Sequence, residues 1–270
     1  MISHFTAHTA SLKGIRESNE DKHIVVLNLD NKDINKAPVN FMGVFDGHGG
    51  KFVSKFLEKN ISTFFTDKRV LYPLSKKYIN AVYDYIQEYL KDKYYNKAYE
   101  CGSTSVVAIH YRQNDSNYLN VFNVGDSRCI ICRGNKAIPL TIDHKPNLPS
   151  EKKRIEELGG KIYYDGADWR VNDLSLSRAF GDIESTPYVT CSPDIFKYKL
   201  EKTDQFVVLA CDGLWDVMTE QEVCDFIINL AFDKQNNKII NKNLNIAKKL
   251  AEYAIQKGSS DNVSVVIYFL

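Results

Sequence analysis

The chain of 270 residues carries 35 basic and 34 acidic side chains, so its formal net charge is only +1. A balanced charge gives no overall field that would draw the protein to nucleic acid or to a membrane surface. No apolar run approaches the roughly 20 residues that span a bilayer, and the polar opening Met1-Ile2-Ser3-His4 does not resemble a secretory signal. We find no internal repeat or linker, and therefore expect a single domain over residues 1–270.

Seven segments rich in Val, Ile, Phe and Tyr, each bounded by turn residues, predict β-strands. In chain order they are His23–Leu29, Asn40–Phe45, Ser103–Tyr111, Tyr118–Val124, Arg128–Cys132, Gln205–Cys211 and Val263–Leu270. Helical periodicity predicts helices over about 52–64, 75–91, 220–230 and 244–256. Thr219 and Glu222 have the spacing of a capping box at the start of the third helix. Adjacent early helices and short-linked strand pairs favour an α+β fold with antiparallel sheets under helices.

The segment from Asp143 to about Pro193 has a different character. It holds one short predicted helix, Ser150–Leu158, followed by Gly159-Gly160 and polar, irregular sequence. A segment of this length without strong periodicity is usually a lid or a binding loop in a compact domain. We therefore expect residues 143–193 to take part in substrate selection.

Six cysteines are scattered along the chain, several of them within apolar runs. This usage is typical of reduced thiols that pack as small hydrophobic side chains in an intracellular protein. Cys129 and Cys132 form one CxxC, but no second CxxC or His pair completes a zinc site. Because residues three apart in a strand point to opposite faces, we expect neither a zinc nor a redox role for this pair.

Four aspartates stand where an apolar run stops or starts. Asp46, Asp126 and Asp212 each follow a predicted strand, and Asp261 precedes the last one. For any single one, ordinary turn chemistry is a sufficient explanation. Carboxylates gathered at one sheet rim, however, repel one another unless they bind protons or a cation, and oxygen ligands suit Mg²⁺ or Mn²⁺. The four together predict a divalent-metal centre.

A histidine accompanies the first aspartate in Asp46-Gly47-His48. The glycine allows a sharp turn, so that its carbonyl can face a metal. Glycines flank His48 on both sides, which removes a packing explanation and leaves it placed to protonate a leaving oxygen. The run from Gly47 to Lys51 lacks the spacing of a nucleotide-binding P-loop, and we discard that interpretation.

The charged run Arg16-Glu17-Ser18-Asn19-Glu20-Asp21 would ordinarily be a solvated loop. Glu20 and Asp21 come directly before the first predicted strand, however, so they too could reach a sheet rim. Arg16 offers a planar fork that suits a phosphate better than Lys does.

These motifs, taken in order, resemble the metal-dependent Ser/Thr phosphatases of the protein phosphatase 2C family. The resemblance covers nearly the whole chain and is specific because eight motifs occur with consistent spacing. They are Arg16…Glu20-Asp21, Val44-Phe45-Asp46-Gly47-His48-Gly49-Gly50, Gly102-Ser103-Thr104, Asn123-Val124-Gly125-Asp126-Ser127-Arg128, Asp143-His144-Lys145-Pro146, Leu176-Ser177-Arg178-Ala179-Phe180-Gly181-Asp182, Ala210-Cys211-Asp212-Gly213-Leu214-Trp215-Asp216-Val217 and Ser260-Asp261-Asn262-Val263-Ser264.

The resemblance implies a four-layer α-β-β-α sandwich of two mainly antiparallel sheets flanked by helices. It also implies a role for each motif residue: Asp46 would bridge two Mg²⁺ or Mn²⁺ ions, Asp212 and Asp261 would complete one site, and Glu20 and the carbonyl of Gly47 would help to hold the other. Asp21 would orient metal-bound water, Arg16 would grip the substrate phosphate and His48 would be the general acid. Asp126 would belong to a third, weaker metal site shared with Asp212, with Thr104 near it.

The function implied is the removal of phosphate from phosphorylated Ser/Thr proteins in signalling, by a water or hydroxide that bridges the metals. Two alternatives stay open at this point: a catalytically weak adaptor of the same fold, and a phosphatase of small molecules. We expect an intracellular monomer in the cytoplasm, with the nucleus as an alternative, and no nucleic-acid or membrane partner.

Overall fold

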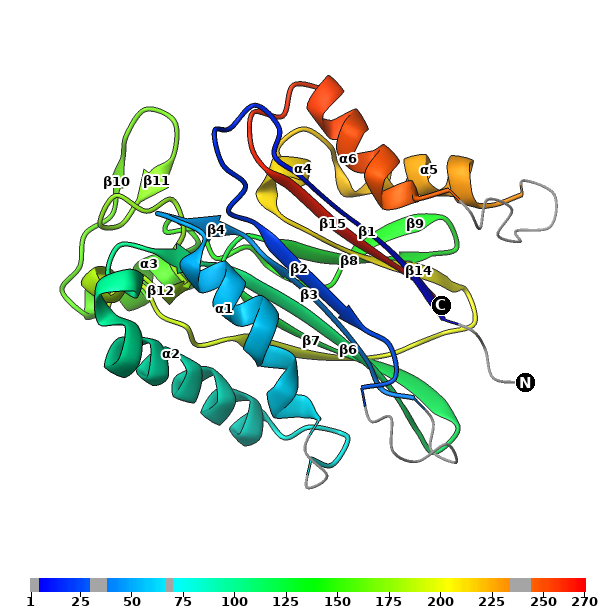
Figure 1. Ribbon diagram of the computed structural model, residues 1–270, viewed down its shortest axis with the longest axis horizontal. Coiled ribbons are helices and arrows are strands. Elements are labelled where there is room, and N and C mark those ends of the chain that lie inside the picture. The colour runs from blue at the N-terminus through cyan, green and yellow to red at the C-terminus, as the bar shows by residue number, and fades with distance from the viewer. Residues whose placement is uncertain (1–4, 30–37, 67–69, 234–243) are drawn as a thin grey trace.

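The computed structural model describes residues 5–29, 38–66, 70–233 and 244–270. Two antiparallel sheets of five strands each lie face to face, with helices α1 and α2 covering one outer side and α5 and α6 the other (Figure 1). The expected α+β class and the four-layer α-β-β-α sandwich are confirmed. In the described ranges, no helix is both long and apolar enough to cross a membrane.

Both large sheets consist of antiparallel neighbours throughout. One sheet has the order β13-β7-β6-β3-β2 and the other the order β1-β15-β14-β8-β9. The strands of the first are β2 Lys22–Val26, β3 Asn40–Phe45, β6 Ser105–Gln113, β7 Ser116–Val124 and β13 Asp194–Lys199. Those of the second are β1 Thr6–Leu12, β8 Arg128–Arg133, β9 Lys136–Pro139, β14 Asp204–Ala210 and β15 Val263–Phe269.

Two smaller sheets complete the β-structure. β12 (Phe180–Gly181), β5 (Gly102–Ser103) and β4 (Gly47–His48) form a three-stranded sheet, and β10 (Tyr163–Tyr164) pairs with β11 (Trp169–Arg170). All strands predicted from the sequence are present within a few residues of the expected bounds. In the two large sheets the prediction missed β1, β9 and β13, which are edge strands that are only partly buried.

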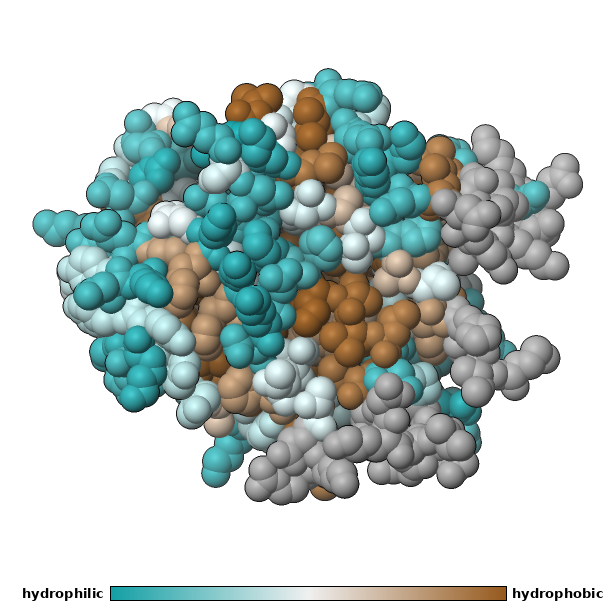
Figure 2. Space-filling model, viewed as in Figure 1, coloured by the Kyte–Doolittle hydropathy of each residue, from teal (hydrophilic) through white to brown (hydrophobic). Residues whose placement is uncertain are grey.

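The helices are α1 Phe52–Asn60, α2 Lys76–Ala98, α3 Pro149–Glu157, α4 Asp212–Trp215, α5 Glu220–Ala231 and α6 Ile246–Gln256, with 3₁₀ turns over Ile61–Phe65 and Ile183–Ser185. The capping box of Thr219 and Glu222 is present at the start of α5. Helix α1 buries Val53 and Leu57 in the hydrophobic cluster between the helix and the sheet. Figure 2 shows a hydrophilic band over α1, with apolar side chains gathered on both sides of it.

Three large hydrophobic clusters fill the spaces between the layers. One lies under α1 and α2, one under α5 and α6, and the third between the two sheets. Cys129 packs in the middle cluster and Cys132 in the cluster under α5, so the two thiols point to opposite faces of β8 as expected. All six cysteines are buried and free within the described part of the chain, which agrees with their interpretation as core residues.

The antiparallel arrangement brings the predicted strand-end acids to one end of the sandwich. Asp46 follows β3 and Asp21 precedes the neighbouring β2, while Asp212 follows β14 and Asp261 lies shortly before the neighbouring β15. Because neighbouring antiparallel strands run in opposite directions, the end of one lies beside the start of the next. The small three-stranded sheet and the β10–β11 hairpin lie at this end too (Figure 1).

Candidate metal centre

The residues predicted to form the site converge on one cleft of about 490 Å³. Its walls include Arg16, Glu20, Asp46, Gly47, His48, Asp126, Asp212 and Asp261. Asp21 and Thr104 are buried and lie behind this wall. The geometry therefore brings together residues that are up to 245 positions apart in the sequence, as in the pair of Arg16 and Asp261.

Burial and mutual repulsion make the central carboxylates hard to ionise. The pKa of Asp46 is raised well above its usual value, first by burial and then by the charges of Asp212, Asp21 and Asp126. Burial, followed by the charges of Asp126 and Asp216, raises the pKa of Asp212 to about 7. Oδ2 of Asp21 is buried without a hydrogen-bond partner among the described residues. A divalent cation would relieve the repulsion and supply the missing counter-charge.

The donor atoms of this cluster suit a hard cation. The thiol of Cys211 is close enough to Asp21 and Asp46 for the three ligand atoms to lie within 4.8 Å of one another. Burial raises the pKa of Cys211 well above its usual value, and its Sγ accepts the Ser264 N–H at 3.1 Å. The thiol is therefore neutral and hydrogen-bonded, which leaves carboxylate and carbonyl oxygens as ligands. Such oxygen ligands fit Mg²⁺ or Mn²⁺ better than Zn²⁺.

The loop that carries Glu20 is tied closely to the Asp46-Gly47 turn. The Glu20 carboxylate accepts the N–H of Gly50 at 2.9 Å, and the Glu20 carbonyl accepts the Ser54 hydroxyl. A Cβ on Gly47 would lie 2.5 Å from that carbonyl. Only glycine therefore allows the two segments to approach this closely.

Arg16 and Asp261 form an ion pair across the mouth of the cleft, with 2.6 Å between Nη2 and Oδ2. The Arg16 side chain is 58% exposed, so it is accessible to a phosphate. Asn262, for which no role was predicted, holds the loop that carries Arg16 and Glu20. Its side chain donates to the carbonyls of Lys13 and Ser18 and accepts the N–H of Glu20 at 2.8 Å. Its place in the motif from Ser260 to Ser264 was the signal in the sequence.

His48 has a partner that the sequence interpretation missed. Its Nε2 lies 2.7 Å from Oδ2 of Asp182, which is only 2% exposed. Burial alone would lower the pKa of His48, but the Asp182 carboxylate, together with the charges of Asp126 and Glu20, outweighs burial and raises this pKa above 6.5. A Cβ on Gly102 would lie 2.1 Å from Asp182 Oδ2 and 2.5 Å from His48 Nε2. Gly102 therefore leaves the space in which this pair forms.

Asp126 and Thr104 also have direct partners. Asp126 is 3% exposed, and its Oδ2 lies 2.5 Å from Nζ of Lys145. The Lys145 ammonium group thus binds the carboxylate that was predicted to hold a third metal. Thr104 Oγ1 accepts the N–H of Asp46 at 3.1 Å, and the Thr104 N–H donates to the Asp46 carbonyl at 2.9 Å. Thr104 therefore holds the backbone of the central aspartate in place.

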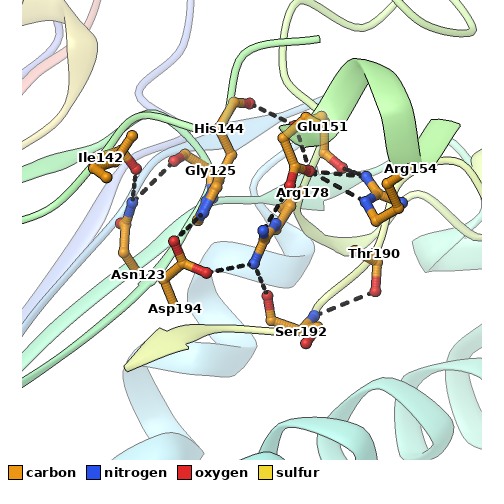
Figure 3. A network of polar contacts seen from close by, with 11 residues as sticks. Asn123, Gly125, Ile142, His144, Glu151, Arg154, Arg178, Thr190, Ser192 and Asp194 are labelled. Atoms are coloured by element: carbon orange, nitrogen blue, oxygen red, sulfur yellow. Dashed lines mark hydrogen bonds and ion pairs between the residues drawn. The ribbon is translucent and has the colours of Figure 1, made fainter. Parts of the chain in front are cut away.

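The segment 143–193 is anchored by a network of ion pairs (Figure 3). Glu151 is buried between Arg178 and Arg154, at 2.6 and 2.9 Å, and these arginines outweigh the effect of burial and hold its pKa at about 2. Arg178 also binds Asp194 at 2.9 Å, which in turn lies 3.2 Å from Nε2 of His144. These ion pairs therefore fix the base of the segment to the sheet, while its residues 170 and 173–176 line the cleft.

Comparison with known proteins agrees with the fold. The family model described as protein phosphatase 2C matches residues 6–263. The chain is 35% identical over 268 residues to "Probable protein phosphatase 2C 59" of Oryza sativa subsp. japonica, covering 98% of this chain and 76% of that protein. It is 45% identical over 167 residues to a PP2C-like domain-containing protein of Acanthamoeba polyphaga mimivirus, covering 56% of this chain and 93% of the viral protein.

Among solved structures, that of a C. elegans sex-determining protein superposes with a TM-score of 0.87 at 28% identity, covering 99% of this chain and 65% of that one. A serine-threonine phosphatase 2C from Toxoplasma gondii shares the fold, with a TM-score of 0.80 at 23% identity and coverage of 98% and 94%. The chain therefore belongs to the protein phosphatase 2C family and is a metal-dependent Ser/Thr protein phosphatase.

Proposed function

We propose that the acidic cleft holds two Mg²⁺ or Mn²⁺ ions, and that Asp46 bridges them. Asp212 and Asp261 would complete one site, and Glu20 with the Gly47 carbonyl would help to form the other. The observation that carries this proposal is the burial of Asp46 beside Asp212, Asp21 and Asp126, which is costly without a counter-cation. When bound, the two cations would stabilise the charge on the phosphoryl group and supply a nucleophile at neutral pH.

The protein's own residues would bind the phosphate and move the proton. Arg16 would bind the phosphate oxygens through its planar fork, since it is exposed at the mouth of the cleft. His48 would donate a proton to the departing serine or threonine oxygen, because Asp182 keeps its imidazole protonated to a higher pH. Asp21 would support the ligands from behind, and Thr104 would hold the Asp46 backbone.

A third, weaker metal position at Asp126 belongs to the same proposal. The Lys145 ammonium already neutralises Asp126, so a cation there would have to displace it, and this competition would explain a low affinity. The substrates would be phosphoserine and phosphothreonine proteins, and residues 143–193 would help to select among them.

We further propose that residues 1–270 form a single domain, since the hydrophobic cluster between the two sheets contains residues from both sheets. We also propose that this domain acts as an intracellular, cytoplasmic monomer without nucleic-acid or membrane partners.

The test is phosphate release from a phosphoserine peptide after removal of divalent ions. We expect no turnover with a chelator, recovery with Mn²⁺ or Mg²⁺, and loss of at least a hundredfold in Asp212→Asn. Asp115→Asn is the control, because Asp115 is 94% exposed and its only described ion pair is with Arg112. Activity that survives both chelation and Asp212→Asn would overturn the proposal. A chain without turnover at saturating Mn²⁺ that still binds a protein partner would be an adaptor instead.

A further inference from the structure

Gln87 of helix α2 makes two hydrogen bonds to the backbone of a single residue, Gly181. Its side-chain Nε2 donates to the Gly181 carbonyl at 2.8 Å, and its Oε1 accepts the Gly181 N–H at 2.9 Å. Gly181 ends β12, which lies at the edge of the small three-stranded sheet. The next residue, Asp182, donates its N–H to the Cys101 carbonyl on the β5 side. Because these directions alternate along a strand, Gly181 faces away from β5 and toward α2.

The clamp of Gln87 acts one residue from the partner of His48. The Asp182 carboxylate lies 2.7 Å from His48 Nε2. The backbone at Asp182 is held by two sets of hydrogen bonds: those of Gln87 to the preceding Gly181, and that of the Asp182 N–H to the Cys101 carbonyl. Space around this backbone is limited, since a Cβ on Gly181 would lie 2.2 Å from the Cys101 carbonyl. A shift of β12 would therefore move the Asp182 carboxylate away from the imidazole.

Helix α2 holds β12 through a second contact on the same face. Tyr83, one helical turn before Gln87, packs its ring 5.1 Å from that of Phe180, and both side chains are fully buried. The position of β12 is thus set by apolar packing from Tyr83 and by direction-specific hydrogen bonds from Gln87. Removing the amide would leave a buried N–H and C=O without these partners.

We propose that Gln87 is a positioning residue for the phosphatase reaction: it clamps Gly181 and thereby holds the Asp182 carboxylate on His48. Gln87 is not among the residues that line the acidic cleft. Helix α2 would therefore control the placement of the proton donor from outside the cleft. This inference rests on the proposed role of His48 as general acid.

The substitution Gln87→Leu removes both hydrogen bonds while keeping a side chain of similar size, and Gln87→Glu retains an oxygen that can accept the Gly181 N–H. Gln221→Leu is the matched control. Gln221 of α5 also donates to one carbonyl, that of Asn135 at 2.9 Å, and accepts one N–H, that of Ala137 at 3.0 Å. It belongs to the opposite helical layer, far from His48 in the fold (Figure 1).

The assay compares substrates whose leaving groups need a proton to different degrees. For Gln87→Leu we expect kcat on phenyl phosphate and on a phosphoserine peptide to fall about tenfold to a hundredfold. The fall on p-nitrophenyl phosphate should be much smaller, because its leaving group departs without help from an acid. KM and the Mn²⁺ concentration for half-maximal activity should stay unchanged. The fall in kcat should be smaller for Gln87→Glu than for Gln87→Leu. Gln221→Leu should retain full activity on all three substrates.

A double-variant cycle then separates positioning from general destabilisation. In a His48→Gln background, adding Gln87→Leu should cost no further rate on phenyl phosphate, since its effect would pass through the absent imidazole. An equal loss on all substrates, or a further loss in the His48→Gln background, would overturn the inference. If His48→Gln itself shows no preference between leaving groups, the proposed role of His48 fails and the inference with it. A selective His48→Gln beside an unselective Gln87→Leu would overturn the inference alone.

Discussion

Removing the charge of Asp212 is expected to stabilise the metal-free protein, although it removes one of the proposed metal ligands. Burial and the neighbouring charges of Asp126 and Asp216 raise the pKa of this carboxyl from 3.8 to about 7 in the folded state. The folded protein therefore binds a proton at Asp212 more tightly than the unfolded chain does. Between about pH 4 and pH 7 stability should fall as the pH rises, and above pH 7 the whole penalty is present.

The magnitude follows from the difference between the two pKa values. A difference of about 3 units corresponds to about 4 kcal/mol, and because Asp46 shares the repulsion, we expect Asp212→Asn to recover about 1–4 kcal/mol at pH 8. For a chain of this size, each kcal/mol raises the melting temperature by about 2–4 °C. At pH 4, where the wild-type carboxyl is neutral in the folded state, the difference should nearly vanish.

The assay is thermal unfolding in a chelator at pH 4 and pH 8, followed by the same experiment with Mn²⁺. Without metal at pH 8, Asp212→Asn should melt several degrees above the wild type. With Mn²⁺ the order should reverse, because the wild type gains binding energy that the variant cannot gain. An Asp212→Asn variant that melts below the wild type in chelator at pH 8 would refute the reasoning that the acid cluster is strained without a cation. Asp115→Asn should leave both melting temperatures unchanged.

Three further outcomes are expected from the geometry of the cleft. Gly102→Ala should reduce kcat at least tenfold with little change in Mn²⁺ affinity, because the added Cβ would force His48 and Asp182 apart; unchanged kcat would contradict this. Asp182→Asn should move the basic limb of the kcat–pH profile to lower pH, since the carboxylate that raises the pKa of His48 is lost; an unmoved limb would argue against the pair. Lys145→Met should lower the free energy of unfolding by about 2 kcal/mol in chelator, because it leaves Asp126 without its ion pair. In urea titrations, added Mn²⁺ should raise the stability of this variant more than that of the wild type.

The strand-end pattern was enough to place the acids, because the place where an apolar run stops is a local property of the sequence. Antiparallel pairing of β3 with β2 and of β14 with β15 then brings those ends together, and this much follows from the fold class. Family resemblance supplied what the local pattern did not: the importance of Glu20, which otherwise looks like a solvated charge.

The partners of the predicted residues could not be read from the sequence, since they are set by contacts through space. Asp182 lies 134 positions from His48 in the chain, and the pairing of both β12 and β4 with β5 brings them together. The same holds for residues 143–193. Their sequence shows weak periodicity, yet the buried Glu151 binds Arg154 and Arg178, which fixes a segment that local propensity leaves irregular.

The central claim is that the carboxylates of this cleft are the ligands of two catalytic cations. Calorimetric titration of the chelator-treated protein with Mn²⁺ at pH 7.5 tests it most directly, in the wild type and in Asp46→Asn. The account predicts at least two Mn²⁺ ions per wild-type chain, with protons released as they bind, and loss of the tight sites in the variant because Asp46 is shared between them. Equal stoichiometry and affinity in the two proteins would contradict it.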